Sequence, residues 1–419
     1  MIRSLFLLLF ATLLTALLAE AQPDQVPHRE IDLTKDEPDF SLFDDAFYAN
    51  QLFLLGESHG VKQPQQLDLT LLKHLNRRVG VRFYIAEVDP TKAWYLNQYL
   101  QTGQDSLLRL VFRSWVAETA QWANQDFYRK IEGIRALNQT LPRARQIRFV
   151  GIDAIQDRPL VARQLRELTQ HPAFAPDTPR LDSLTTYLNP ANKHPDSLAA
   201  QVAINWLAHL ARTPAQYRRI PPTTRAELTA TLSGLGYRKT IRKREATLFA
   251  NFRDAVVRLG LAQEKLYGFW GAYHVGMAPQ STGAQPFASL VQASDLPMRG
   301  KTVSLLCRYV DSFSMVPSAY LPPFWQDAGK LYTRLDKFND NGPMMIIDGI
   351  ETFITQSRPN TLTLFKLPGT LVGKQPITAT YSPFMPDNQK LLFDPKRPAT
   401  DYFQYIFLVR NSDMTQPMP

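Results

Sequence analysis

Short apolar runs alternate with longer amphipathic stretches over the first part of the chain. Three apolar runs, at 51–56, 81–88 and 147–152, are each followed by polar residues. Apolar side chains at helical spacing separate the first two runs: Leu67, Leu71, Leu72 and Leu75. Short apolar runs separated by helical patterns are typical of parallel strands buried on both faces. The pattern therefore predicts an α/β fold with a mainly parallel central sheet and helices on both faces.

The same periodicity predicts helices at 93–100, 114–138 and 241–259 and strands at 265–272 and 302–309. A proline-bearing stretch at 157–197 and amphipathic stretches at 197–212 and 223–232 predict a helical insertion that caps the fold. Beyond residue 316 the strand patterns are short, at 343–354, 362–366 and 402–410. We expect a short-stranded C-terminal region there.

Residues 1–21 have the pattern of a signal peptide, with Arg3 before an apolar run at 5–18 and Ala19-Glu20-Ala21 at its end. The run is shorter than the ~20 residues that a membrane span needs, and no later segment reaches that length. No cysteine lies near the predicted cleavage site, which excludes a lipoprotein anchor. We expect an exported protein, periplasmic or secreted, without a membrane span. Residues 22–45 are polar and proline-bearing, and predict an extended lead-in.

Charge and cysteine content narrow the function classes. The formal charge is +9, but Lys and Arg are scattered, with dense clusters only at 77–78, 238–239 and 242–244. Because no basic helix carries interleaved stacking aromatics, a solvated basic surface is favoured over nucleic-acid binding. Cys307 is the only cysteine, which excludes an intramolecular disulfide and zinc sites built on several cysteines. The expected partner is a small-molecule substrate, and the sequence leaves the oligomeric state open.

Gly-Glu-Ser-His-Gly at 56–60, directly after the first apolar run, fits two incompatible catalytic motifs. As Gly-x-Ser-x-Gly it is a nucleophile elbow, with Ser58, Asp153 and His274 in the chain order of an α/β-hydrolase triad. As Gly-Glu-x-His it places a carboxylate and an imidazole at the carboxyl end of a parallel strand, where open α/β sheets bind ligands. Several strands precede the elbow in the hydrolase fold, but apart from the run at 51–56 no clear strand pattern precedes Ser58. The second interpretation is therefore favoured.

Acids and histidines recur at successive strand ends: Glu57 with His59, then Glu87, Asp153 and His274. Any one of them is also typical of a helix cap or a surface position, but their recurrence favours one common site. A carboxylate beside an imidazole orients it and raises its basicity for proton abstraction from water. Two close carboxylates divide into acid and base roles. The same oxygen and nitrogen atoms suit a divalent metal, so a metal-dependent hydrolase is an alternative.

Further motifs occur in an order that resembles the erythromycin esterase-like family, part of a group that includes ChaN-like haem-binding proteins and the TraB/Tiki proteins. The motifs are Gly-Glu-Ser-His-Gly, Glu87, Trp115 with Glu118, Trp122 and Asn124, the strand end 149–153, Arg244-Glu245 with Leu248 and Asn251, Tyr273-His274-Val275, and 402–407. Two departures from the family pattern separate the chain from the macrolide esterases in detail. One residue instead of two lies between Glu57 and His59, and the first histidine of a later His-Asn-x-His motif is absent.

The resemblance implies hydrolysis of an ester, lactone or amide by activated water, without a covalent serine. It assigns His59 as general base, Glu57 and Glu87 as its orienting acids, and His274 with Arg244 as oxyanion stabilisers. The implied supporting residues are Asp153, Glu245 and Asn251. This interpretation requires no cofactor. The group's other members make a haem or small-ligand carrier a further alternative.

The resemblance also implies a domain organisation. Residues 46–315 are expected to form a catalytic α/β domain with a helical insertion at about 157–235. Residues 316–419 are expected to pack on the same domain as a C-terminal segment.

Overall fold

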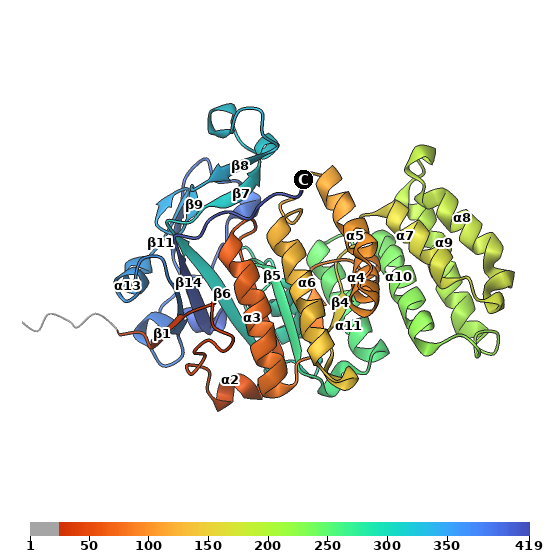
Figure 1. The fold of residues 1–419 in the computed structure, drawn as a ribbon, viewed down its shortest axis with the longest axis horizontal. Coiled ribbons are helices and arrows are strands. Elements are labelled where there is room, and N and C mark those ends of the chain that lie inside the picture. Colours follow the sequence, from red (N-terminus) through yellow and green to blue (C-terminus); the bar gives the residue numbers. More distant parts are fainter. Residues whose placement is uncertain (1–24) are drawn as a thin grey trace, which may run out of the picture.

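A mainly parallel eight-stranded sheet forms the centre of the computed structural model, which describes residues 25–419 (Figure 1). In spatial order its strands are β1 (His28–Ile31), β12 (Leu362–Lys366), β14 (Tyr405–Arg410), β6 (Thr302–Val310), β2 (Leu52–Glu57), β5 (Leu266–Gly271), β3 (Phe83–Ala86) and β4 (Arg148–Gly151). Neighbouring strands from β14 to β4 run parallel, and β12 and β1 extend the sheet antiparallel. The predicted α/β fold with a mainly parallel sheet is confirmed. The predicted signal peptide at 1–21 lies outside the described residues.

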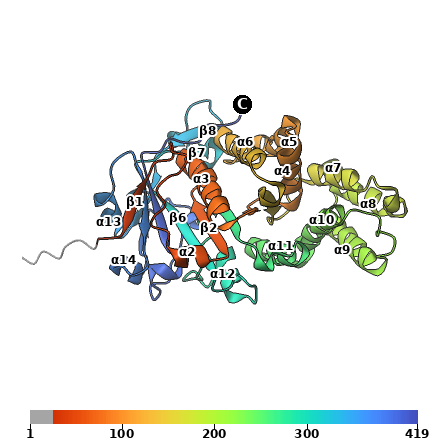
Figure 2. The ribbon, with the colours of Figure 1, turned by 60° about the horizontal axis from the view of Figure 1, so that its bottom comes forward.

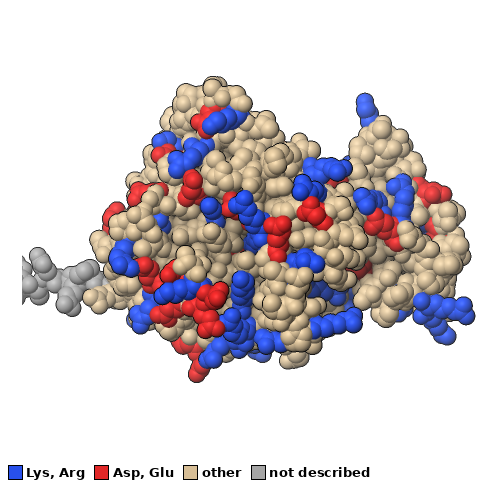
Figure 3. All heavy atoms as spheres, viewed as in Figure 1, with Lys and Arg blue, Asp and Glu red and all other residues tan. Residues whose placement is uncertain are grey.

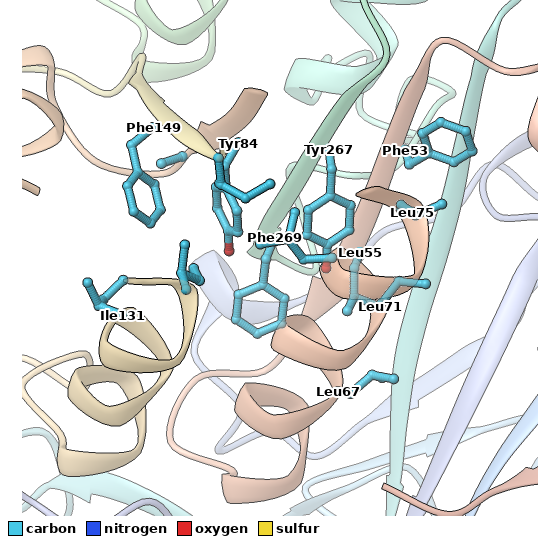
Figure 4. Packing of buried hydrophobic residues seen from close by; sticks show 14 of the residues in the cluster. Phe53, Leu55, Leu67, Leu71, Leu75, Tyr84, Ile131, Phe149, Tyr267 and Phe269 are labelled. Carbon is cyan, nitrogen blue, oxygen red and sulfur yellow. The ribbon is translucent and has the colours of Figure 1, made fainter. Parts of the chain in front are cut away.

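Alternating side chains of the central strands divide the core between the two faces of the sheet. Phe53 and Leu55 of β2 belong to a cluster with α3 (Lys62–Val79) and α6 (Gln125–Thr140). Leu52 and Leu54 belong to a cluster with α11 (Arg244–Arg258) and α12 (Phe287–Ala293). Successive side chains of a strand point to opposite faces, so a strand covered on both faces is apolar throughout. Figure 4 shows the first cluster, in which aromatic side chains of β5 lie between α3 and α6.

The predicted single helix at 114–138 is wrong, because two helices occupy this stretch. α5 (Asp105–Ala117) and α6 are separated by residues 118–124, which we call the 118–124 loop. Thr119 has a φ of +52°, in the left-handed region, where a right-handed helix cannot continue. Asn124 then caps α6, its side-chain oxygen accepting a 2.7 Å hydrogen bond from the N–H of Phe127. Trp122 therefore lies in a loop and not on a helix.

Residues 158–240 include four α-helices, which lie beyond the β4 edge of the sheet (Figures 1 and 2). They are α7 (Arg158–Leu168), α8 (Thr178–Leu188), α9 (Asp196–Arg212) and α10 (Pro222–Thr240). Their buried residues form a separate apolar cluster that includes Leu165, Leu184, Trp206 and Leu228. α7 and α10 also contact α4 (Pro90–Thr102), and α10 contacts α11. Because α10 leads directly into α11, the packing of the insertion helps to set the position in space of the first turn of α11.

The C-terminal residues combine two strands of the central sheet with short antiparallel pairs. The pairs are β7 (Ser314–Pro317) with β8 (Tyr332–Leu335), β9 (Phe338–Asn339) with β10 (Gly342–Pro343), and β11 (Met345–Ile347) with β13 (Ala379–Tyr381). The short helices of this region are α13 (Ile350–Thr355) and α14 (Leu371–Lys374), whereas the short α2 (Asp45–Ala49) precedes β2. The end of the chain returns to the centre, where isolated bridges join Val61 to Met414 and Asn124 to Pro417.

Two surface properties bear on the expected partners. Among residues 25–419, the helices are all too short or too polar to cross a membrane. On the face drawn in Figure 3, Lys and Arg side chains are interspersed with Asp and Glu, and no continuous basic patch is visible there.

Candidate active site

The carboxyl ends of four adjacent strands, β2, β5, β3 and β4, border one cavity of about 340 Å³. Each end carries an ionisable side chain that lines this cavity: Glu57 and His59 after β2, Glu87 after β3, Asp153 after β4, and His274 after β5. Arg244, the first residue of α11, lines it too. The structure thus brings together the residues that the strand-end pattern and the family resemblance singled out.

His59 is held by Glu57 and presents its second ring nitrogen to the cavity. Its Nδ1 lies 2.5 Å from Oε1 of Glu57, a carboxylate that is only 3% exposed. Since a carboxylate accepts, Nδ1 carries the proton and Nε2 is left with its lone pair. Nε2 has no hydrogen bond to another described residue. A Cβ on Gly271 would lie 3.4 Å from Nε2 and 3.5 Å from Cε1, so the glycine keeps the space beside these two ring atoms open.

The charge around His59 favours its protonated form. Burial lowers the pKa of His59, but the charges of Glu57 and Glu87 and the hydrogen bond from Glu57 raise it, and the net pKa lies above its ordinary value of 6.5. The imidazole is about a third exposed at 32%. Its ring also meets the ring of Trp122 edge-on, with 5.2 Å between the centroids. His59 is therefore a basic imidazole within reach of a ligand in the cavity.

His274 lies between two carboxylates on the opposite side of Gly271. Its Nδ1 is 2.8 Å from Oε1 of Glu245, and its Nε2 is 3.2 Å from Oε1 of Glu87. Burial lowers the pKa of His274, but these two carboxylates raise it to about 9. Nη1 of Arg244 is also 2.8 Å from Nε2. A protonated Nε2 cannot accept from Arg244, so in the imidazolium form Nε2 donates to Glu87, and the carboxylates offset the repulsion between the two cations.

Arg244 joins the ends of β3 and β4. Its Nε and Nη2 donate to the two oxygens of Asp153 at 3.0 and 2.6 Å, and Nη2 also donates to Oε1 of Glu87 at 2.8 Å. The N–H of Gly271 donates to the other oxygen of Glu87 at 2.8 Å. Burial raises the pKa of Glu87, but the charges of His274, His59 and Arg244 outweigh this and hold it well below its usual range. Glu87 is thus ionised, with His274 and Arg244 as direct partners and the charge of His59 nearby.

The supporting residues on α11 hold the ends of β4 and β5. Glu245 accepts from the backbone N–H of Phe287 at 2.7 Å while it contacts His274, which ties the ring to α12. The side-chain amide of Asn251 donates to the carbonyls of Ile152 and Asp153 at 2.9 and 3.2 Å. These contacts set the backbone that carries Asp153.

The alternative triad of Ser58, Asp153 and His274 is not assembled. Both ring nitrogens of His274 are occupied by Arg244, Glu87 and Glu245, and among the described residues no hydrogen bond joins His274 to Ser58. The backbone N–H of Ser58 donates to the hydroxyl of Tyr309 at 2.9 Å, which fixes the turn after β2. The geometry therefore favours the acid–histidine interpretation of the motif.

Sequence reasoning missed a buried charged pair at the base of the cavity. Lys130 of α6 lines the cavity, and its Nζ lies 2.7 Å from Asp68 of α3. Asp68 is fully buried and also accepts from the hydroxyls of Tyr84 and Tyr267 at 2.6 and 2.8 Å. Lys130 lies three residues after Phe127, on the apolar stripe of α6. A charged residue in such a stripe is the signal that could have revealed the pair.

The C-terminal tail fixes the 118–124 loop beside His59. The N–H of Thr415 donates to the carbonyl of Gly60, and the N–H of Met418 donates to the carbonyl of Ala123, at 2.8 and 3.0 Å. The N–H of Gln125 donates to the carbonyl of Gln416 at 2.7 Å. The tail therefore holds the loop that places Trp122 at the mouth of the site.

The donor set does not fit the metal alternative. Within residues 25–419, no group of three or more His, Cys, Asp and Glu side chains is arranged to hold a metal ion. The candidate ligands Glu87, Asp153 and His274 instead share the guanidinium of Arg244.

Comparison with known proteins supports the fold. No protein-family model matches the chain, and no curated protein matches its sequence. Among solved structures, a protein from Bacillus cereus has a TM-score of 0.68 at 13% identity, covering 93% of this chain and 94% of its own. The erythromycin esterase EreC, in its open conformation, has a TM-score of 0.62 at 13% identity, covering 93% and 98%. A succinoglycan biosynthesis protein has a TM-score of 0.65 at 13% identity, covering 94% and 96%. The fold is thus similar to that of an erythromycin esterase over nearly the whole length.

Proposed function

We propose that this protein is an exported hydrolase that cleaves an ester, lactone or amide with water activated by His59. The observation that carries the proposal is the pairing of His59 Nδ1 with Glu57 at 2.5 Å while Nε2 faces the cavity beside Gly271. A neutral imidazole held in this tautomer is a general base, and a buried carboxylate behind it stabilises the imidazolium that forms. The erythromycin esterase fold supports the same reaction class.

In the proposed reaction, Nε2 of His59 takes a proton from water, and the hydroxide attacks the carbonyl carbon of the substrate. The negative oxygen that develops faces Arg244, which stabilises it by charge and by a hydrogen bond from Nη1, and the imidazolium of His274 adds its positive charge. Collapse of the tetrahedral intermediate breaks the bond to the alcohol or amine. That leaving group takes the proton from His59, which restores the neutral base. Glu87 and Asp153 hold Arg244 in place throughout.

The full chain is tested on p-nitrophenyl acetate, a γ-lactone and an anilide. His59→Asn is the informative variant, because the asparagine amide can replace Nδ1 as donor to Glu57 but cannot act as a base. We expect it to lower kcat/KM by about 10²–10⁴-fold. Ser58→Ala should keep wild-type activity, and the wild type should show no burst of alcohol release. Wild-type rates in His59→Asn, or loss of activity in Ser58→Ala, would refute the proposal.

A further inference from the structure

A second cavity, a groove of about 680 Å³, lies where the helical insertion meets α11. It is bordered by the C-terminal turns of α9, the N-terminal part of α10 and the C-terminal half of α11, and α10 contacts both of the other helices (Figure 2). Among residues 25–419, none lines both this groove and the cavity of His59. The groove is therefore a separate candidate site, which the proposed hydrolysis does not use.

Much of the lining of this groove is apolar and open to solvent. Leu207 and Leu210 of α9 are only partly buried, and Ala211 and Pro214, which follow them, are exposed. On the other side of the groove, Val257 of α11 is 79% exposed. Single exposed apolar side chains are ordinary, but apolar side chains gathered in a concave surface are typical of binding sites. The lining therefore suits an aliphatic chain.

Three arginines line the same groove without a carboxylate partner. Among the described residues, none forms a hydrogen bond or an ion pair with the guanidinium group of Arg225, Arg253 or Arg258. The Nε atoms of Arg225 and Arg258 are buried, whereas the terminal Nη groups of both side chains remain accessible. The one acid in the lining, Asp254, already accepts from the hydroxyl of Tyr237 at 2.5 Å. The groove therefore carries positive charge that the protein itself does not pair.

The surroundings of Arg258 leave its charge incompletely compensated. Burial lowers the pKa of Arg258, and the charges of Glu227 and Asp254 raise it by less, so that its pKa lies below the ordinary value of 12.5. Arginine still carries its charge at neutral pH. A guanidinium group in this situation gains from a carboxylate, whose two oxygens match its parallel N–H donors. The charge of the groove thus favours an anionic ligand over a neutral or cationic one.

We propose that this groove binds an aliphatic carboxylate, such as a free fatty acid, with its carboxylate on the arginines and its chain along the apolar lining. A small hydrophilic anion would leave the apolar side chains exposed, and an uncharged chain would leave the arginines unpaired. An anionic amphiphile satisfies both. The volume of about 680 Å³ lies within the range of small-molecule sites, roughly 300–1,000 Å³, which favours a single ligand molecule over a membrane or a protein partner. The proposal does not depend on the hydrolase function.

Calorimetric titration of the full chain with decanoate, below the concentration at which decanoate forms micelles, tests this proposal. Acetate lacks the chain and decyltrimethylammonium lacks the negative charge, and we expect each to bind at least about tenfold more weakly than decanoate. Arg258→Met keeps the apolar stem and removes the charge, so it should weaken decanoate binding by at least about tenfold. Arg166→Met is the matched control, because Arg166 is an exposed residue of α7 that does not line the groove. It should leave the affinity unchanged.

Misfolding would not imitate this result. Arg258 has no partner to lose, so urea unfolding of Arg258→Met should match that of the wild type, and Arg253→Met, at an exposed position, should weaken binding in the same direction. No binding of decanoate, equal affinity for decyltrimethylammonium, or an affinity that both variants leave unchanged overturns the proposal. Sedimentation with phosphatidylglycerol vesicles that decanoate does not displace, or a dimer that Val257→Asp dissociates, would assign the groove to a membrane or to a second copy and overturn it too.

Discussion

Replacing Gly271 by alanine should lower the activity without weakening the fold. The new Cβ lies 3.4 Å from Nε2 of His59 and 3.5 Å from Cδ2 of His274, so the methyl group stands between the two imidazoles. A water molecule deprotonated by Nε2 must approach to about 2.6–3.2 Å, and the methyl group narrows the space that this water needs. Losing general-base catalysis costs about 10²–10⁴ in rate, or about 3–5 kcal/mol of transition-state stabilisation.

Stability should respond differently to the same substitution. The contacts of the new Cβ are at ordinary van der Waals distances, and the φ of Gly271 lies outside the left-handed region. Alanine in a strand is favoured over glycine by roughly 0.5–1 kcal/mol, so the free energy of unfolding should be unchanged or slightly higher.

The assay is kcat/KM on p-nitrophenyl acetate together with urea unfolding. Gly276→Ala is the matched control, because its Cβ would meet only Tyr273, Pro286 and Tyr402, at 3.5 to 4.0 Å. It should keep both activity and stability. Wild-type activity in Gly271→Ala would show that the nucleophile does not form in front of His59, and would refute the mechanism.

Three further predictions follow from the charges and contacts of the site. The kcat/KM of the wild type should rise with pH through a pKa above 6.5, because Glu57 raises the pKa of His59. Glu57→Gln should move this rise of kcat/KM to lower pH. An unchanged pH profile would contradict the role of Glu57 in raising the pKa of His59. The pKa of His274 is about 9 in the folded chain and has its ordinary value of 6.5 in the unfolded chain. The contribution of protonated His274 to the free energy of unfolding is therefore complete below about pH 6.5 and is lost as the pH rises through about 9. Urea unfolding at about pH 6 and about pH 9.5 should differ by up to about 3 kcal/mol, and by less in His274→Gln. Deleting residues 414–419 removes the hydrogen bonds that hold the 118–124 loop beside His59, so kcat/KM should fall several-fold to about tenfold, whereas deleting residue 419 alone should leave it unchanged.

Much of the sheet and its rim could be predicted because local sequence determines them. The strand at 52–57 is buried on both faces, so its apolar run carries the signal by itself. The side chains that follow parallel strands share one edge, so Glu57, Glu87, Asp153 and His274 could be grouped without knowing the strand order. The hydrogen bonds of Glu57 to His59 and of Glu87 to Arg244 are consistent with that grouping.

The rest depends on contacts between distant parts of the chain. β14 lies between β12 and β6, an arrangement that no local pattern encodes. Arg244 reaches the rim because α11 packs under β4, where Asn251 holds the end of the strand. Composition and spacing therefore did not indicate Arg244 as a site residue, whereas the family resemblance did. The break between α5 and α6 comes from the backbone conformation of a single residue, Thr119. The spacing of apolar residues around it remains helical and does not reveal the break.

The ion pairs at the rim distinguish residues that stabilise the fold from residues that are required only for catalysis. Without Arg244, the carboxylates of Glu87 and Asp153, which are only 15% and 10% exposed, lose a shared partner and are left as uncompensated charges at the rim. Activity lost in Arg244→Ala therefore cannot be assigned to the oxyanion. His59 differs, because only Glu57 depends on it, and an asparagine can still donate to that carboxylate. Under the proposed mechanism, a chain that kept Arg244, Asp153 and Glu87 but lacked His59 would fold with the same cavity and bind without hydrolysing, so we propose that His59 is the residue that would distinguish a hydrolase from a binding protein on this scaffold.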